Sequence, residues 1–188
     1  GLGVGFIWIE IPLMQRFTLL LGSPIYSISI TLASLLIFSG LGSLLAHVLE
    51  KRMGNPKQWV GLLALGVAVY LLSSIFLWNH IVNTAVSAPF LVRAMICGAI
   101  LLPLGLGLGM FLPLGLQLVG THHPSGVAWA WGINYGFTVL GSTLSIVIAQ
   151  FLGFSVVLLC AACSYLFAAA AFWKLHGALQ SRCSVVKA

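Results

Sequence analysis

The sequence holds very few side chains that could do acid–base or metal chemistry. Glu10 and Glu50 are the two acidic residues among 188. General acid–base catalysis and hard-metal sites both draw on carboxylates, as does the recognition of cationic substrates. The sequence therefore predicts no catalytic residue, no metal and no cofactor in this chain.

Five polar residues interrupt apolar runs and are candidates for a functional role: Glu10, Gln15, Arg16, Arg93 and Asn134. A carboxylate in the middle of a membrane span costs a few kcal/mol, so Glu10 should face the protein interior, a partner or a water-filled cavity. One hypothesis makes the five residues a path for a proton or a ligand. The alternative is a buried polar cluster that fixes the order of the helices, with the arginines reaching toward the membrane surface.

Cysteine and histidine form no metal pattern. Cys160 and Cys163 have the spacing of a redox pair, but they lie inside an apolar run without the strand–helix context of such pairs. His47 and His176 are the one pair at a matching depth for a membrane haem. Both stand at the ends of apolar runs, where an interfacial histidine is ordinary, so a haem is the weaker interpretation.

The elements that must position these residues are membrane helices. Hydrophobic residues make up 61% of the chain and charged residues 5%, against about a quarter charged in soluble domains. Breaks rich in Gly, Pro and polar residues divide the chain into apolar stretches of about 20 residues or more, the length of a membrane span. We expect an all-α membrane protein with one six-helix transmembrane domain over residues 1–176 and a short cytoplasmic tail over 177–188. The six spans are expected at about 1–21, 24–48, 59–78, 89–118, 127–151 and 154–175.

Basic residues set the expected direction of the chain. Lys and Arg follow the second span, at Lys51, Arg52 and Lys57, and the sixth, at Lys174, Arg182 and Lys187. The loops on the other side, 22–24, 79–88 and 152–153, contain neither. The positive-inside rule therefore places both ends in the cytoplasm. The same flanking positions suit anionic lipid headgroups, and no nucleic-acid partner is expected from the net charge of +6.

Small residues predict where helices pack. Gly132, Gly136, Gly141 and Ser145 follow one another at four- or five-residue spacing in the fifth span, the pattern that lets two helix backbones approach closely. The run Gly105-x-Gly107-x-Gly109 resembles a nucleotide loop in spelling, but no acidic residue follows it to hold a ribose. The fourth span, with Pro103 and Pro113, is expected to bend or partly unwind.

Three segments together resemble a known family. They are GLGVGFIWIEIPLMQRFTLLLGSPIYSISITLASLLIFSGLGSLLA at the start, GMFLPLGLQL over 109–118 and WAWGINYGFTVLGSTLS over 129–145. The chain is similar to the C-terminal membrane region of bacterial spermidine synthase-like integral membrane proteins, which carry major-facilitator-like helices beside an aminopropyltransferase-type domain. The resemblance implies a bundle like half of a major-facilitator fold, in the bacterial inner membrane, and it includes Glu10, Gln15, Arg16 and Asn134.

Three hypotheses of function follow. The first is a non-catalytic membrane module of a spermidine synthase-like protein, which anchors a soluble domain or partner and passes a small solute. The second is an accessory or scaffold subunit of a larger membrane complex, in contact with lipids and other membrane subunits. The third is the membrane part of a polyamine-related transferase or transporter. Because the sequence starts at Gly1 within an apolar run, we expect an upstream part, and any aminopropyl transfer would occur there.

Overall fold

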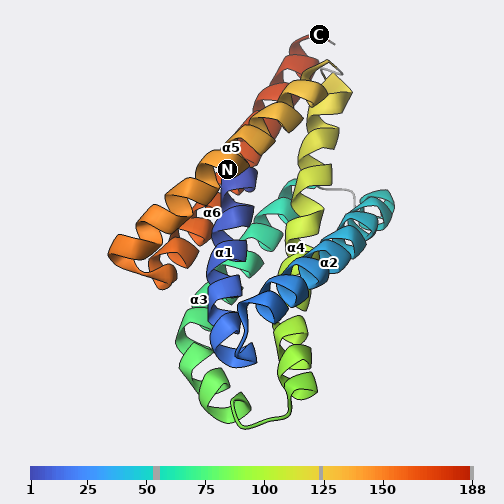
Figure 1. The fold of residues 1–188 in the computed structure, drawn as a ribbon. Coiled ribbons are helices and arrows are strands. Elements are labelled where there is room, and N and C mark those ends of the chain that lie inside the picture. Colours follow the sequence, from blue (N-terminus) through green and yellow to red (C-terminus); the bar gives the residue numbers. More distant parts are fainter. Residues whose placement is uncertain (53–55, 123–124, 187–188) are drawn as a thin grey trace.

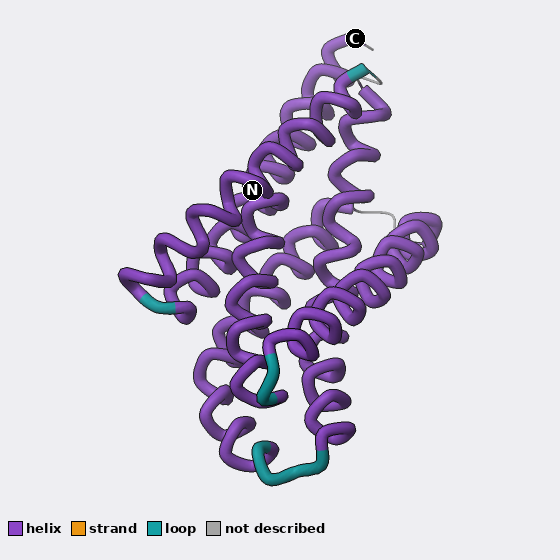
Figure 2. Tube along the Cα trace, viewed as in Figure 1, coloured by secondary structure: helices purple, strands orange, loops and turns teal. Residues whose placement is uncertain are grey.

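The computed structural model is all-helical over the residues it describes, which are 1–52, 56–122 and 125–186 (Figures 1 and 2). Six helices follow one another in this part of the chain: α1 (Leu2–Leu21), α2 (Pro24–Arg52), α3 (Pro56–Ala85), α4 (Phe90–His122), α5 (Gly126–Leu152) and α6 (Phe154–Val186). Each contains a stretch long and apolar enough to cross a membrane. The structure is therefore that of a multi-pass membrane protein, as the composition indicates.

Glycine and proline end and start the helices. Gly22 closes α1 in the left-handed region, with φ 77°, and its N–H donates to the carbonyl of Thr18. A residue with a Cβ adopts this conformation reluctantly, whereas glycine does so freely. Pro24 and Pro56 then open α2 and α3, at the helix position where a missing N–H does no harm. Gly153, with φ 86°, separates α5 from α6.

The helices are longer than the apolar stretches within them. The third was expected to end near residue 78, but α3 continues to Ala85. Its polar last turns remain helical, and Thr84 Oγ1 there donates to the carbonyls of His80 and Ile81. The expected tail over 177–188 is helical to Val186. The expectation that α4 partly unwinds is wrong: the helix is continuous through Pro103 and Pro113.

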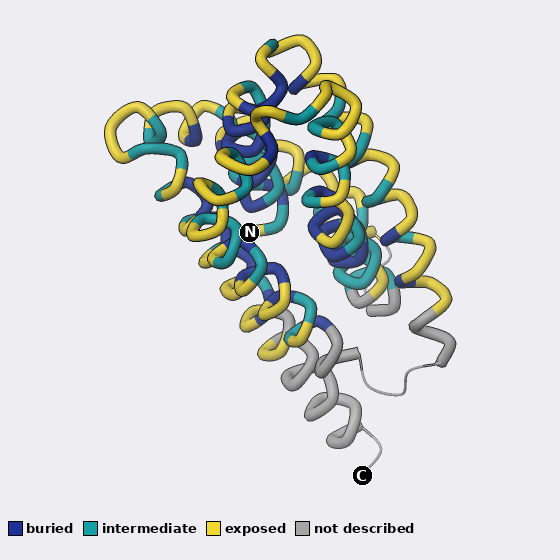
Figure 3. The backbone as a smooth tube through the Cα atoms, turned by 90° about the horizontal axis from the view of Figure 1, so that it is seen from below, coloured by how far each residue is buried: buried dark blue, intermediate teal, exposed yellow. Residues whose placement is uncertain are grey.

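Helix α1 is the centre of the bundle. It contacts each of the other five helices, and half of its span is buried. The other spans surround it, and the most exposed of them are α2 and α5, which are 17% and 11% buried. Figure 3 shows the buried residues on the inner sides of the helices and the exposed ones around the outside. A residue on α1 is therefore inside the protein, whereas much of α2 and α5 faces outward.

The closest helix pair is α2 with α4, and glycines bring the two backbones together. A Cβ added at Gly105 would lie 2.5 Å from Phe38 Cβ, and one added at Gly109 would lie 2.6 Å from two backbone atoms of Ser39. Gly42 makes the reciprocal approach from α2, against the backbone of Leu106. We call these three glycines the α2–α4 seam. It holds α2 against α4 while the outer face of α2 remains uncovered.

Candidate functional site

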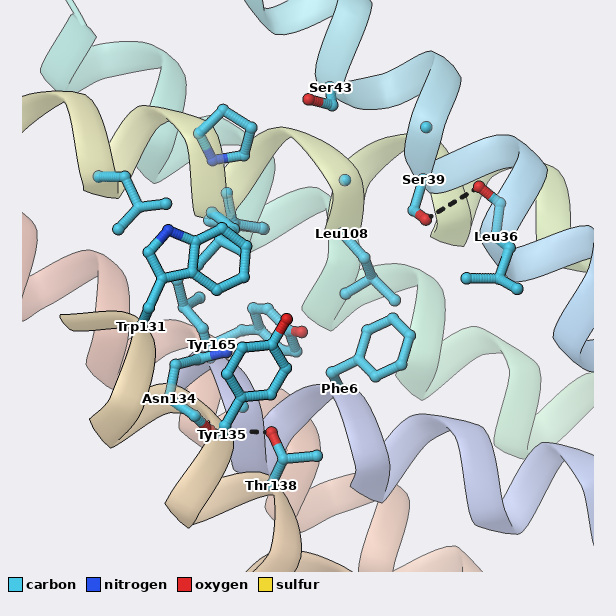
Figure 4. Close-up of a pocket in the computed structure, with 18 residues that line it drawn as sticks. Phe6, Leu36, Ser39, Ser43, Leu108, Trp131, Asn134, Tyr135, Thr138 and Tyr165 are labelled. Carbon is cyan, nitrogen blue, oxygen red and sulfur yellow. Dashed lines mark hydrogen bonds between the residues drawn. The ribbon is translucent and has the colours of Figure 1, made fainter. Parts of the chain in front are cut away.

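A cavity of about 550 Å³ lies between α2 and α5 (Figure 4). Its wall on one side is α2, with Ser39 and Ser43, and on the other side α5, with Trp131 and Asn134. The N-terminal turns of α1, the middle of α4 and Tyr165 of α6 complete the lining. We call this cavity the α2/α5 pocket. It lies between the two most exposed helices, so it opens at the surface of the bundle.

Aromatic rings and leucines form the apolar part of the pocket lining. Trp131 and Tyr135 stack on α5, with ring centroids 5.4 Å apart and an interplanar angle of 25°. Phe111 and Tyr165 meet across α4 and α6, with centroids 5.1 Å apart. Tyr165 is 2% exposed, so it belongs to the rigid core of the site. Such rings present flat apolar faces with polar tips, which suits a solute that is itself partly apolar.

Uncharged polar groups are interspersed among the apolar side chains of the lining, on α2 and α5. Gly3 of α1 makes room for those of α5, because a Cβ at this position would lie 2.6 Å from Thr138 Oγ1 and 3.0 Å from Asn134 Oδ1. Thr138 Oγ1 donates to the backbone carbonyl of Asn134 at 2.9 Å. In the described structure no hydrogen bond joins the Asn134 side-chain amide to another residue, so it is available to a ligand. On the opposite wall, Ser39 Oγ donates to the carbonyl of Leu36.

Glu10 lies beneath the pocket. Phe6 lines the cavity, and Glu10 follows it by one turn on the same face of α1. Its side chain is 7% exposed. The structure therefore places Glu10 inside the protein, one turn beyond the pocket lining, whereas Gln15 and Arg16 lie further along α1 and Arg93 lies on α4.

Arg16 is held by three groups on α3 and α6. Its Nη2 donates to Ser155 Oγ at 2.9 Å, its Nη1 to the carbonyl of Ser74 at 3.4 Å, and its guanidinium lies 5.4 Å from the ring centre of Trp78. The side chain is 8% exposed. Arg16 thus ties α1 to two neighbours, in the manner of a buried polar cluster that fixes helix order.

Arg93 and Gln15 are not part of the same cluster. Arg93 Nη1 donates to the carbonyl of Leu20, in the last turn of α1, at 2.9 Å. This bond satisfies a helix-end carbonyl that has no partner within its own helix. Gln15 is exposed, because one residue of helical rotation turns it away from the buried side of Arg16. The five polar residues therefore separate into the pocket region, with Glu10 and Asn134, and the opposite end of α1.

The small residues of α5 divide in the same way. Gly141 packs on α1, where a Cβ would lie 2.9 Å from Ile7 Cγ2, and Trp8 Nε1 donates to its carbonyl at 2.9 Å. Ser145 is fully buried. Gly132 and Gly136 were expected to pack as well, but no atom of the described chain lies within 4 Å of a Cβ at either position. Their side of α5 is exposed, so a side chain at either position would meet no helix within the described residues.

No metal or haem site can be built from the described residues. In residues 1–52, 56–122 and 125–186, no three side chains of His, Cys, Asp or Glu gather closely enough to hold a metal ion. His47 is exposed near the end of α2, and the side chain of its proposed haem partner, His176, lies outside the described residues. The side chains of Glu50 and of the basic residues Lys51, Arg52 and Lys57 also lie outside them.

The chain was compared with families, characterised proteins and structures. No family model, curated protein or solved structure matches it. The pocket itself was not predicted from the sequence, because its lining comes from five helices and has no shared motif. One local signal did mark it: the segment Trp131–Asn134 combines an aromatic ring, a glycine and an amide within an apolar run.

Proposed function

We propose that this chain is a non-catalytic, six-span module of a spermidine synthase-like protein of the bacterial inner membrane. In this proposal both ends are cytoplasmic, the module anchors a soluble domain or partner, and the α2/α5 pocket binds a small solute. The observation that carries the proposal is the pocket, with its uncharged lining of aromatic rings, hydroxyls and one free amide. Such a lining offers binding and orientation without a nucleophile or an acid–base pair.

We infer that the pocket is one part of a site shared between two halves of a larger bundle, as in a major-facilitator fold, rather than a complete site within this chain. Transporter folds are commonly built from two repeats, with the solute site between them near the middle of the membrane. Here the two walls of the pocket, α2 and α5, are also the two most exposed spans. A Cβ added at Gly40 on α2, or at Gly132 or Gly136 on α5, would have no described atom within 4 Å outside its own helix backbone. We infer that a second six-helix unit packs against α2 and α5 and closes the pocket.

Leucine substitution at the outward-facing glycines tests this arrangement. Gly40→Leu in the pocket lining and Gly132→Leu on the exposed side of α5 add a large side chain where a Cβ would meet no described atom within 4 Å, so they should weaken association with a second unit and leave the module folded. Gly66→Leu on α3 is the matched control. A Cβ at Gly66 would also have no described atom within 4 Å, and Gly66 does not line the pocket. The measurement is the mass of the detergent-solubilised assembly and its crosslinking in native membranes. Equal association of all three variants and the wild type would contradict the proposed second unit.

The direction of the chain is tested separately. Cysteines placed at Lys57 and Lys187, in a chain freed of its native cysteines, should both react with a membrane-impermeant maleimide only after the cytoplasmic side is opened. Cysteine at Ser87, in the loop between α3 and α4, should react in intact cells. Reaction of Lys57→Cys and Lys187→Cys from opposite sides would exclude an even number of crossings between them and, with it, the proposed topology.

A scaffold role in a larger complex is the second candidate. It is favoured by the wide apolar face of α5, where Trp129, Phe137 and Phe151 are all strongly exposed. In that case Gly132→Leu should release a different membrane subunit rather than a second six-helix unit. Mass spectrometry of the crosslinked product distinguishes the two outcomes.

A further inference from the structure

Glu10 is a buried carboxyl without a protein partner. It is 7% exposed, and within the described part of the chain no hydrogen bond or ion pair involves it. A carboxylate surrounded by apolar atoms must be paired, hydrated or neutralised by a proton, because the bare charge is too costly to bury. Since no cation pairs with Glu10, only water or a proton remains to stabilise it.

A second buried group without a partner lies at the same level. Thr31 of α2 is fully buried, and its Oγ1 makes no hydrogen bond in the described structure. Helices α1 and α2 run in opposite directions, and Ser27 Oγ of α2 donates to the carbonyl of Met14 of α1 at 2.5 Å. Counting one helical turn from Met14 and from Ser27, away from the loop that joins α1 and α2, gives Glu10 on α1 and Thr31 on α2. The register of the two helices therefore puts the carboxyl of Glu10 and the hydroxyl of Thr31 on facing sides of α1 and α2, and no hydrogen bond joins the two groups in the described structure.

The lining of the α2/α5 pocket ends one helical turn short of Glu10. Phe6 is the α1 residue of the lining that lies furthest along the helix, and Glu10 is one turn, about 6 Å, beyond it on the same face. The residual exposure of Glu10 is consistent with access from this direction. Thr31, by contrast, is fully enclosed.

We propose that Glu10 is a proton-exchanging residue at the inner end of the α2/α5 pocket. In this proposal Glu10 is a neutral carboxylic acid that turns to donate a hydrogen bond to Thr31 Oγ1, a bond not made in the described structure, and its proton exchanges with water that enters through the pocket. Loss of the proton places a single negative charge beneath an otherwise uncharged pocket. The inference uses the pocket as a water route and does not depend on the proposed solute or second unit.

The titratable groups of the neighbouring helices are engaged elsewhere, exposed or uncharged. The two arginines of the described spans bond to other groups, Arg16 to α3 and α6 and Arg93 to the end of α1. The remaining described groups are His47 at the far end of α2, Tyr26 against Phe90, Tyr70 donating to the carbonyl of Ile100, the exposed His80 in the last turns of α3, Cys97 of α4, Tyr135 against Trp131, Tyr165 against Phe111, and Cys160, Cys163 and the exposed Lys174 of α6. Protonation of Glu10 is therefore governed by its burial and by Thr31.

Infrared difference spectroscopy tests the protonation state. A glutamate in water has a pKa of about 4.3 and is ionised at neutral pH. The protonated acid has a distinct C=O stretch, and with only two acidic residues in the chain, wild type minus Glu10→Gln isolates the band of Glu10. We expect a protonated-acid band at pH 7 in lipid nanodiscs. A carboxylate band in its place would overturn the proposal.

A carbodiimide that partitions into lipid provides an independent measurement. Such reagents modify protonated carboxyls in apolar surroundings, so Glu10 should gain one adduct at pH 7, located by mass spectrometry. Glu10→Gln should lose that adduct and retain any adduct at Glu50. Wild-type protein without an adduct at Glu10 would overturn the assignment of a protonated acid.

Two further variants test the partner and the route. Thr31→Val should shift the acid band of Glu10, because the hydrogen bond is lost, whereas Ser145→Ala, which removes another buried hydroxyl without a partner, should not. For the route, a bulky maleimide on Ser39→Cys should slow the deuterium exchange of the band at least severalfold, and the same reagent on Gly66→Cys should have no effect. If the acid band of Glu10 does not shift in Thr31→Val, Thr31 is not its hydrogen-bond partner. If the deuterium exchange of the band is unchanged after labelling at residue 39, water does not reach Glu10 through the pocket.

Discussion

The α2–α4 seam predicts a large difference between two glycines of one helix. A Cβ at Gly109 would lie 2.6 Å from the Cα and carbonyl carbon of Ser39, whereas at Gly115, less than two turns further along α4, nothing lies within 4 Å. Ordinary contact begins near 3.4 Å, so Gly109→Ala has to push the two backbones apart by at least about 0.8 Å. Overpacking of this kind costs about 1–3 kcal/mol. Alanine at Gly115 meets no such contact and improves helix propensity by up to about 1 kcal/mol.

The assay is equilibrium unfolding of both variants in mixed micelles, followed by the fluorescence of the six tryptophans. Gly109→Ala should reduce the free energy of unfolding by about 1–3 kcal/mol, and Gly115→Ala should leave it unchanged or raise it. Since both substitutions add the same methyl group to the same helix, the difference between them isolates the contact with Ser39. Equal stability of the two variants would refute the close approach of α2 and α4.

Three smaller predictions follow from single contacts. Trp8→Phe removes the hydrogen bond to the carbonyl of Gly141 and should cost about 0.5–1.5 kcal/mol in the same unfolding assay. Ser155→Ala removes a hydroxyl that accepts from Arg16 Nη2, and a loss of about 1.5 kcal/mol is expected; no loss would show that the bond is replaced by water or lipid. Gly22→Ala forces a side chain into the left-handed region at φ 77° and should cost about 1–2 kcal/mol, measured as a shift of the thermal midpoint in detergent.

The existence and limits of the spans were predictable because they depend on local properties. Long apolar stretches and the breaks at Gly22, Pro24 and Gly153 locate the six helices to within a few residues where the breaks are sharp. Where a break is only polar, as after residue 78, the helix continues to Ala85, so polar residues alone do not end it. The prolines of α4 were given too much weight, since the helix is continuous through both.

The packing was less predictable, because a spacing of small residues does not tell which face of a helix points inward. The stripe of α5 was singled out, yet Gly132 and Gly136 face outward and only its later part contacts α1. The closest approach is made by Gly105 and Gly109, which in the sequence resemble a nucleotide loop. Only the path of α2, some 60 residues earlier, determines their role.

The candidate site was predictable only in part. The burial of Glu10 follows from the cost of a charge in an apolar run. The position of Glu10 relative to Thr31 and to the pocket depends on the register of α1 against α2 and on where α5 packs. Neither can be read from a short stretch of sequence. The six-residue spacing of Glu10 and Arg16 puts them on different faces of a helix, and in the structure Arg16 bonds to α3 and α6 while no bond joins it to Glu10.

The central place of α1 affects the biogenesis of the protein. The helix that every other helix surrounds is made before them, and the hydroxyl that accepts from Arg16 belongs to Ser155, 139 residues later. At synthesis rates of about 5–20 residues per second, that interval lasts about 7–28 s. During this time the arginine and the glutamate of α1 must be tolerated by lipid, by the insertion machinery or by transient partners. Insertion of this chain is therefore complete only when its last span arrives.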